Sequence, residues 1–117
     1  MTCTAETFAE TFAELARDAA STAYRARGLK NKADSLAYAK ALLQAVAFGG
    51  RTYDSHVDKS DHVLRVAGAA LATCRAAIAA IDGQGGFHTL DAAVDEVAEA
   101  AESAARLERF DLADLAV

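Results

Sequence analysis

Apolar residues recur at helical spacing along most of this chain. In the segment "ETFAETFAE", Phe8 and Phe12 stand four positions apart, which places both side chains on one face of a helix. The same face continues with Leu15, Ala19 and Ala23. Alanine makes up about a quarter of the chain and proline is absent, so the intrinsic propensities favour helix over sheet. We therefore predict an all-α fold.

Four segments show this spacing: about residues 4–26, about 32–48, from the end of the 49–62 stretch to about 81, and from 90 onward. A chain of 117 residues can bury a core of its own but has little room for a second domain. Helices of similar length with short connections favour a four-helix bundle. We predict one domain over 1–117, an antiparallel up-down-up-down bundle with a short C-terminal extension.

Residues typical of helix ends separate these segments. Gly28 suits a left-handed position after the first helix, and Asn31 suits a cap for the second. The pair Gly49 and Gly50 is expected to end the second helix. The third and fourth helices then have capping candidates in Ser55 or Ser60 and in Thr89.

The third segment has no charged residue between Val66 and Cys74. A helix that is apolar on all sides lies in the centre of its bundle or in an interface between copies, and we predict a homodimer. Cys3 and Cys74 cannot form a disulfide framework. The start "MTCTAETF" lacks the features of a signal peptide, and no charge-free run approaches the ~20 residues of a membrane span. These observations favour the cytoplasm and no membrane role.

The charge of the chain, −5 overall, is concentrated in the last segment, where eight carboxylates and two arginines follow Gly83. Asp91, Asp95, Glu99 and Glu102 succeed one another at helical spacing, with Glu96 beside them, so we expect one acidic ridge. Such a ridge repels DNA and attracts a basic protein surface. The same pattern is also typical of the solvated outer face of an ordinary helix. A second copy would offer a basic surface in its positive turn, made of Arg25, Arg27, Lys30 and Lys32.

Titratable residues also gather in the stretch "GGRTYDSHVDKSDH", residues 49–62. Arg51 and His56 are separated by four residues. This spacing resembles the arginine-to-histidine motif of HEPN-type ribonucleases, small helical bundles that pair their motifs across a dimer. The resemblance covers six residues and implies proton transfer by His56 and phosphate stabilisation by Arg51. Thr52 and Asp58 depart from the residues frequent in that family, and the double glycine interrupts the expected helix.

A metal site is a second alternative for the same stretch. Asp58 and His62 stand one helical turn apart if the third helix has already begun there, and His56 could supply a third ligand. The sequence contains no nucleophile elbow or zinc-binding helix motif, and we expect no cofactor. The leading hypothesis is a cytoplasmic protein that binds another protein, as a regulator, an inhibitor or an accessory subunit. The ribonuclease and the metal site stay open.

Overall fold

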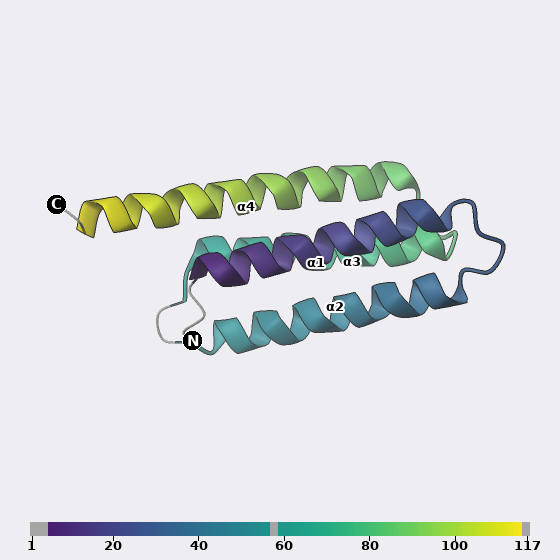
Figure 1. Ribbon diagram of the computed structural model, residues 1–117, viewed down its shortest axis with the longest axis horizontal. Coiled ribbons are helices and arrows are strands. Elements are labelled where there is room, and N and C mark those ends of the chain that lie inside the picture. Colours follow the sequence, from purple (N-terminus) through teal and green to yellow (C-terminus); the bar gives the residue numbers. More distant parts are fainter. Residues whose placement is uncertain (1–4, 57–58, 116–117) are drawn as a thin grey trace.

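The computed structural model describes the backbone of residues 5–56 and 59–115, and the side chains of residues 7–56 and 59–106. This part of the chain forms the helices α1 (Ala5–Ala26), α2 (Ala33–Asp54), α3 (Asp61–Ile81) and α4 (Phe87–Leu115). Figure 1 shows the chain reversing its direction at each connection, and α4 extending beyond the other helices at its C-terminal end. The prediction of an all-α four-helix bundle is confirmed.

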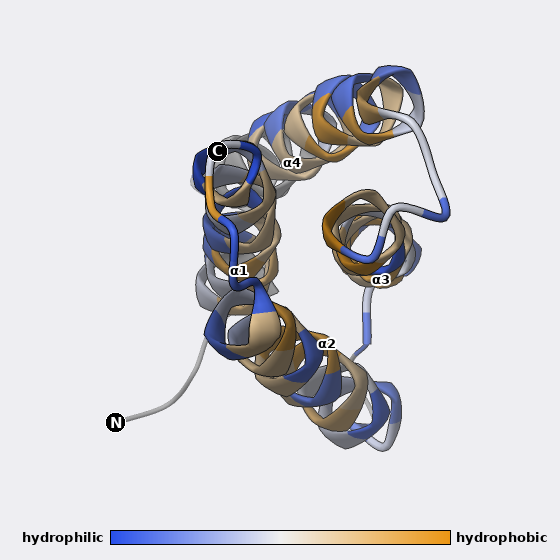
Figure 2. Cartoon of the chain, turned by 90° about the vertical axis from the view of Figure 1, so that its right-hand side faces the viewer, coloured by the Kyte–Doolittle hydropathy of each residue, from blue (hydrophilic) through white to orange (hydrophobic). Residues whose placement is uncertain are grey.

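Helices α1 and α3 form the middle of the bundle, because each of them contacts all of the other helices. Helices α2 and α4 lie on opposite sides and make no contact with each other within the described residues. The end view in Figure 2 shows α3 bordered by α1, with α2 and α4 to either side. Part of the apolar surface of α3 is therefore buried against the other three helices.

The length and hydropathy of α3 would also suit a membrane span, but half of its most apolar window is buried inside the bundle. Packing of α3 against the other three helices accounts for the apolar residues of the buried half.

Small side chains dominate the core, so the helices approach closely. Among the described residues of α1, Phe12 is the one bulky side chain that is fully buried, and the other buried residues are alanines and Thr22. On α3 the fully buried face includes Val63, Val66 and Cys74, whereas Leu64 and Leu71 stand beside it and are only half-buried. The apolar residues of α3 thus divide into a buried row and a partly exposed row.

The prediction that Gly49 and Gly50 end the second helix is wrong, because α2 continues through both to Asp54. The position of Phe12 on α1 explains why a glycine stands inside this helix. A Cβ atom at Gly49 would lie 2.9 Å from Cε1 of Phe12, which is too close for ordinary packing. Gly49 allows the two helices to approach around the Phe12 ring, and a glycine within a helix is tolerated at a cost of about 1 kcal/mol.

The other predicted helix ends are confirmed in part. Gly28 does not adopt a positive φ; within the described residues that conformation occurs at Gly83, just after α3, with φ 76°. Asn31 accepts a hydrogen bond from the backbone N–H of Ala33 at 3.0 Å, but the N-cap position of α2 is Lys32, one residue later than predicted. The prediction that Thr89 caps the fourth helix is wrong, because α4 already begins at Phe87.

The start of α3 settles the choice between the two serines. Ser60 occupies the N-cap position, and its hydroxyl accepts a hydrogen bond from the backbone N–H of His62 at 3.3 Å. Ser55 follows the C-terminal end of α2 instead. The hydroxyl of Tyr53, a buried residue near the end of α2, accepts a hydrogen bond from the backbone N–H of Ser60 at 2.7 Å. This contact joins the end of α2 to the start of α3.

Candidate functional site

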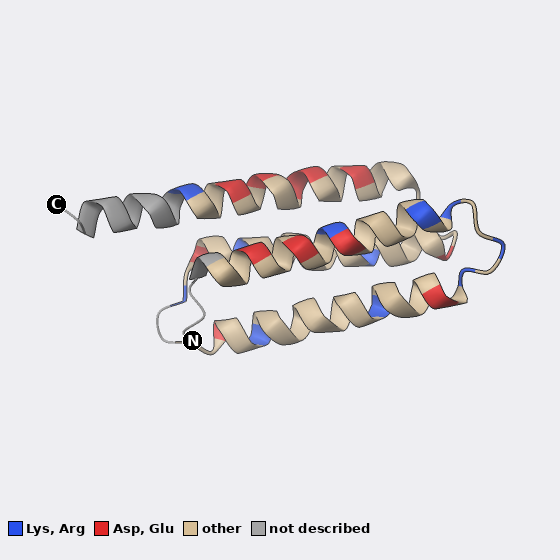
Figure 3. Ribbon diagram, in the orientation of Figure 1, with Lys and Arg blue, Asp and Glu red and all other residues tan. Residues whose placement is uncertain are grey.

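The acidic ridge of α4 comprises Asp91, Asp95, Glu96, Glu99 and Glu102. All five side chains are exposed, and Figure 3 shows carboxylates following one another along the described part of α4. Among the described residues, the one ion pair joins Lys59 to Asp54 at 3.2 Å. No carboxylate of the ridge has a basic partner in this part of the chain. The ridge therefore leaves its negative charge available to another molecule.

Contacts with α1 and α3 fix the orientation of α4. The Tyr24 hydroxyl donates a hydrogen bond to Asp91, at the N-terminal end of the ridge. This hydrogen bond is the main reason that the pKa of Tyr24 is raised, with burial and the charges of Asp91 and Asp95 adding to it. The Tyr24 ring also stacks on Phe87, with 5.6 Å between ring centres, and the guanidinium carbon of Arg27 lies 4.5 Å from the centre of the Phe87 ring.

A buried hydroxyl makes the corresponding contact with α3. Oγ1 of Thr73 lies 2.9 Å from the carbonyl oxygen of Ala69 on its own helix and 3.2 Å from that of Ala93 on α4. Thr73 has no solvent exposure, and a buried polar group is expected to keep its hydrogen bonds. The rotation of α4 that turns the ridge toward solvent is thus set from two sides.

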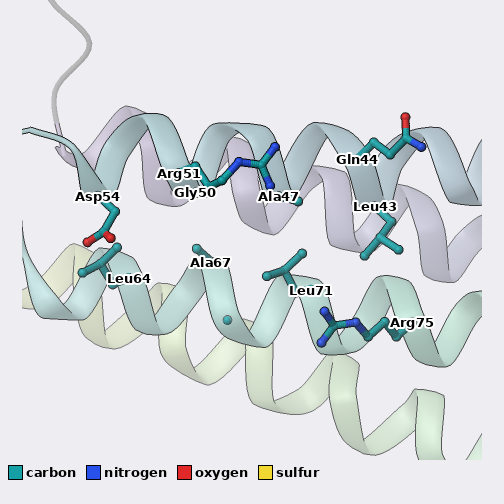
Figure 4. Close-up of a pocket in the computed structure, with 11 residues that line it drawn as sticks. Leu43, Gln44, Ala47, Gly50, Arg51, Asp54, Leu64, Ala67, Leu71 and Arg75 are labelled. Carbon is teal, nitrogen blue, oxygen red and sulfur yellow. The ribbon is translucent and has the colours of Figure 1, made fainter.

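Arg51 lies in α2 and His56 two residues beyond its end, and their side chains contact different helices. Arg51, in the last turn of α2, lines a groove against α3 (Figure 4). The His56 ring packs instead against Phe8 of α1 and against Tyr53, with ring centres 5.7 Å and 5.9 Å apart. Cooperation of a base and a cation on one phosphate requires both to reach it, and no contact in the described residues brings Arg51 and His56 together.

Of the three residues of the metal alternative, the structure describes His56 and His62. His62 is exposed in the first turn of α3, and Asp58 lies outside the described residues. The alternative required the third helix to begin a full turn before His62, whereas α3 begins at Asp61. Among the described residues, no group of three or more His, Cys, Asp or Glu is placed to hold a metal ion.

The cysteine that the structure describes has no features of a catalytic residue. Cys74 is fully buried in the core, and this burial raises the pKa of its thiol to about 11. The thiolate is the reactive form of cysteine, so Cys74 stays protonated near neutral pH and packs as a small apolar side chain.

The groove that contains Arg51 is the feature that the sequence did not reveal. It lies between α2 and α3, has a volume of about 660 Å³, and is lined by apolar side chains together with Arg51 and Arg75. A second hollow, of about 430 Å³, shares Leu43, Gln44 and Arg75 with it and continues it toward Lys40 and Ile78. The sequence pattern that corresponds to this groove is the row Leu64, Leu71 and Ile78 at seven-residue spacing. All three side chains are only half-buried.

Comparison with protein-family models, with curated proteins and with solved structures gave no match to this chain.

Proposed function

We propose that this protein acts by binding another protein through the acidic ridge of α4. The observation that carries the proposal is the exposure of five carboxylates on one helix, with no ion pair to any of them in the described part of the chain. A dense row of like charges repels itself by a few tenths of a kcal/mol per pair along a helix. A basic partner would relieve this repulsion on binding.

The expected partner presents lysine or arginine side chains on a surface that matches the length of the ridge. Each exposed ion pair contributes about 0.2–1 kcal/mol, so several pairs together would contribute a few kcal/mol, with apolar contacts adding to them. Because exposed charges are screened over about 10 Å at 0.1 M salt, binding should be strongly salt-dependent. The same charge disfavours DNA, whose phosphates are negative.

The biological roles that fit such a surface are those of a regulator, an inhibitor or an accessory subunit, and we place the protein in the cytoplasm, with Cys74 as a free thiol. Self-association is a further part of this proposal. The ridge of one copy would meet the basic turn of another, where Arg25, Arg27 and Lys30 are exposed and Lys32 is partly so.

Neutralising the ridge tests the proposal. In a variant with Asp91→Asn, Asp95→Asn, Glu99→Gln and Glu102→Gln, the immobilised protein should retain far less of the proteins that the wild type captures from its own cell extract at 0.1 M salt. The amides keep the size of the side chains, and the amide oxygen that replaces the Asp91 carboxylate can still accept the hydrogen bond from Tyr24. Quantitative mass spectrometry of the captured proteins gives the measurement.

A control variant changes the same amount of charge elsewhere. The residues Glu10, Glu14, Asp34 and Asp61 are all exposed and lie outside the ridge, and their four amide replacements should leave capture unchanged. If the two variants lose the same proteins, net charge and not the ridge determines binding, and α4 is not the contact surface.

A further inference from the structure

The groove between α2 and α3 is an apolar surface with basic residues along it. Leu43 of α2 and Leu64 and Leu71 of α3 give it apolar walls, and all three are only half-buried. Figure 4 shows Leu43 pointing from α2 toward α3, and Arg51 and Arg75 at separate positions along the groove. An exposed apolar surface flanked by arginines is a candidate site for a protein partner, because arginine is enriched at protein interfaces.

The length and shape of the groove suit a helix. The groove and its continuation follow α2 from Lys40 to Asp54, which is about 21 Å at the helical rise of about 1.5 Å per residue. Two helices side by side form a straight depression into which a third can pack its apolar face, as peptide helices do in other hydrophobic grooves. About four turns of such a helix would cover the apolar side chains.

The charge of the groove indicates an anionic occupant. Lys40, Arg51 and Arg75 all line it. Of the carboxylates, Asp54 is paired with Lys59 at 3.2 Å, which leaves Asp82 at the far end. The groove is therefore positive although the chain as a whole has a charge of −5.

We propose that the α2–α3 groove binds an acidic amphipathic helix of a different protein. Two grooves of this chain placed face to face would bring their arginines together, which like-charge repulsion disfavours. The described part of α4 is acidic, but the large exposed apolar side chains of the described residues are Tyr24, Leu29, Tyr38 and Phe48, none of which is on α4. A second copy therefore does not present the required combination of acidic and apolar side chains on a described helix.

The test uses a designed peptide as its probe. A fluorescein-labelled helical peptide of about 18 residues would carry leucines at alternating spacings of three and four, flanked by glutamates. We expect its fluorescence anisotropy to rise on titration with the full-length protein. A peptide with glutamine in place of every glutamate should bind at least about tenfold more weakly at low salt, and because it lacks these charges the acidic ridge does not attract it. Equal binding of both peptides would overturn the proposal.

Gly68 allows the groove to be blocked without disturbing the core. It lines the groove, and a Cβ atom at this position would meet nothing within 4 Å. Gly68→Glu should weaken binding of the acidic peptide by about tenfold or more, and Arg51→Glu combined with Arg75→Glu should do the same. Arg65→Glu is the matched control, because Arg65 is exposed on α3 but does not line the groove.

The acidic peptide should also bind the ridge variant with four amides on α4 as tightly as the wild type, so this proposal can fail or stand independently of the ridge. Binding that survives Gly68→Glu and the double arginine variant would place the peptide elsewhere and contradict the inference. So would a dimer of the wild-type protein, seen by analytical ultracentrifugation, that these same variants dissociate, because the groove would then belong to a second copy.

Discussion

Replacement of Phe12 by alanine is expected to lower the free energy of unfolding by about 3–5 kcal/mol, the usual range for a buried phenylalanine. Phe12 is 1% exposed and is the largest fully buried side chain among the described residues. Its ring lies 6.0 Å from that of Phe8 and faces Gly49 across the contact between α1 and α2. The neighbouring core residues are mostly alanines, which are too short to fill the cavity that the substitution leaves.

Urea unfolding followed by circular dichroism gives the measurement, and the total stability of such a domain is about 5–15 kcal/mol. Phe48→Ala is the control, because Phe48 is 68% exposed on α2 and should change stability by less than about 0.5 kcal/mol. Similar losses for the two phenylalanines would mean that the core is not organised around Phe12.

The second large effect is expected at Gly49, where valine should destabilise the protein by about 1–3 kcal/mol through overpacking. Valine is a better helix former than glycine, so propensity alone predicts the opposite sign. The distance of 2.9 Å between a Cβ atom added at Gly49 and Cε1 of Phe12 decides the outcome. The Phe12 ring is enclosed by the core and cannot move aside without displacing its neighbours.

Gly50 provides the matched comparison. A Cβ atom at Gly50 would lie 3.8 Å from the Cβ of Ala67, which is an ordinary contact, so Gly50→Ala should raise the free energy of unfolding by up to about 1 kcal/mol. Thermal unfolding of both variants gives the comparison. A stabilising Gly49→Val would show that α1 and α2 do not approach closely at this position.

The two glycines also show what the sequence could and could not predict. The helical spacing of the apolar residues was enough to place four helices, because burying one face requires that spacing. A glycine pair is equally consistent with a helix end and with a close contact between helices, and the position of Phe12 on another helix decides between them. Local sequence carries no record of that contact.

The candidate surfaces divide in the same way. The exposure of the acidic ridge followed from the spacing of its carboxylates on one helix. The sequence did not predict the groove, because Leu64 and Leu71 have the spacing of core residues. Only the packing of α2 leaves them partly exposed. Likewise, the spacing of Arg51 and His56 could not show that one packs toward α3 and the other toward α1.

Salt dependence of binding tests most directly whether exposed carboxylates of α4 recognise a basic partner. The binding partner in this measurement is a purified protein that the wild type captures from cell extract. The dissociation constant of the wild type should rise steeply between roughly 0.05 and 0.5 M salt, as expected for contacts between exposed charges at about a Debye length or less. The ridge variant with four amides should bind more weakly at low salt and show a much smaller slope. An unchanged affinity and an unchanged slope in that variant would contradict the account.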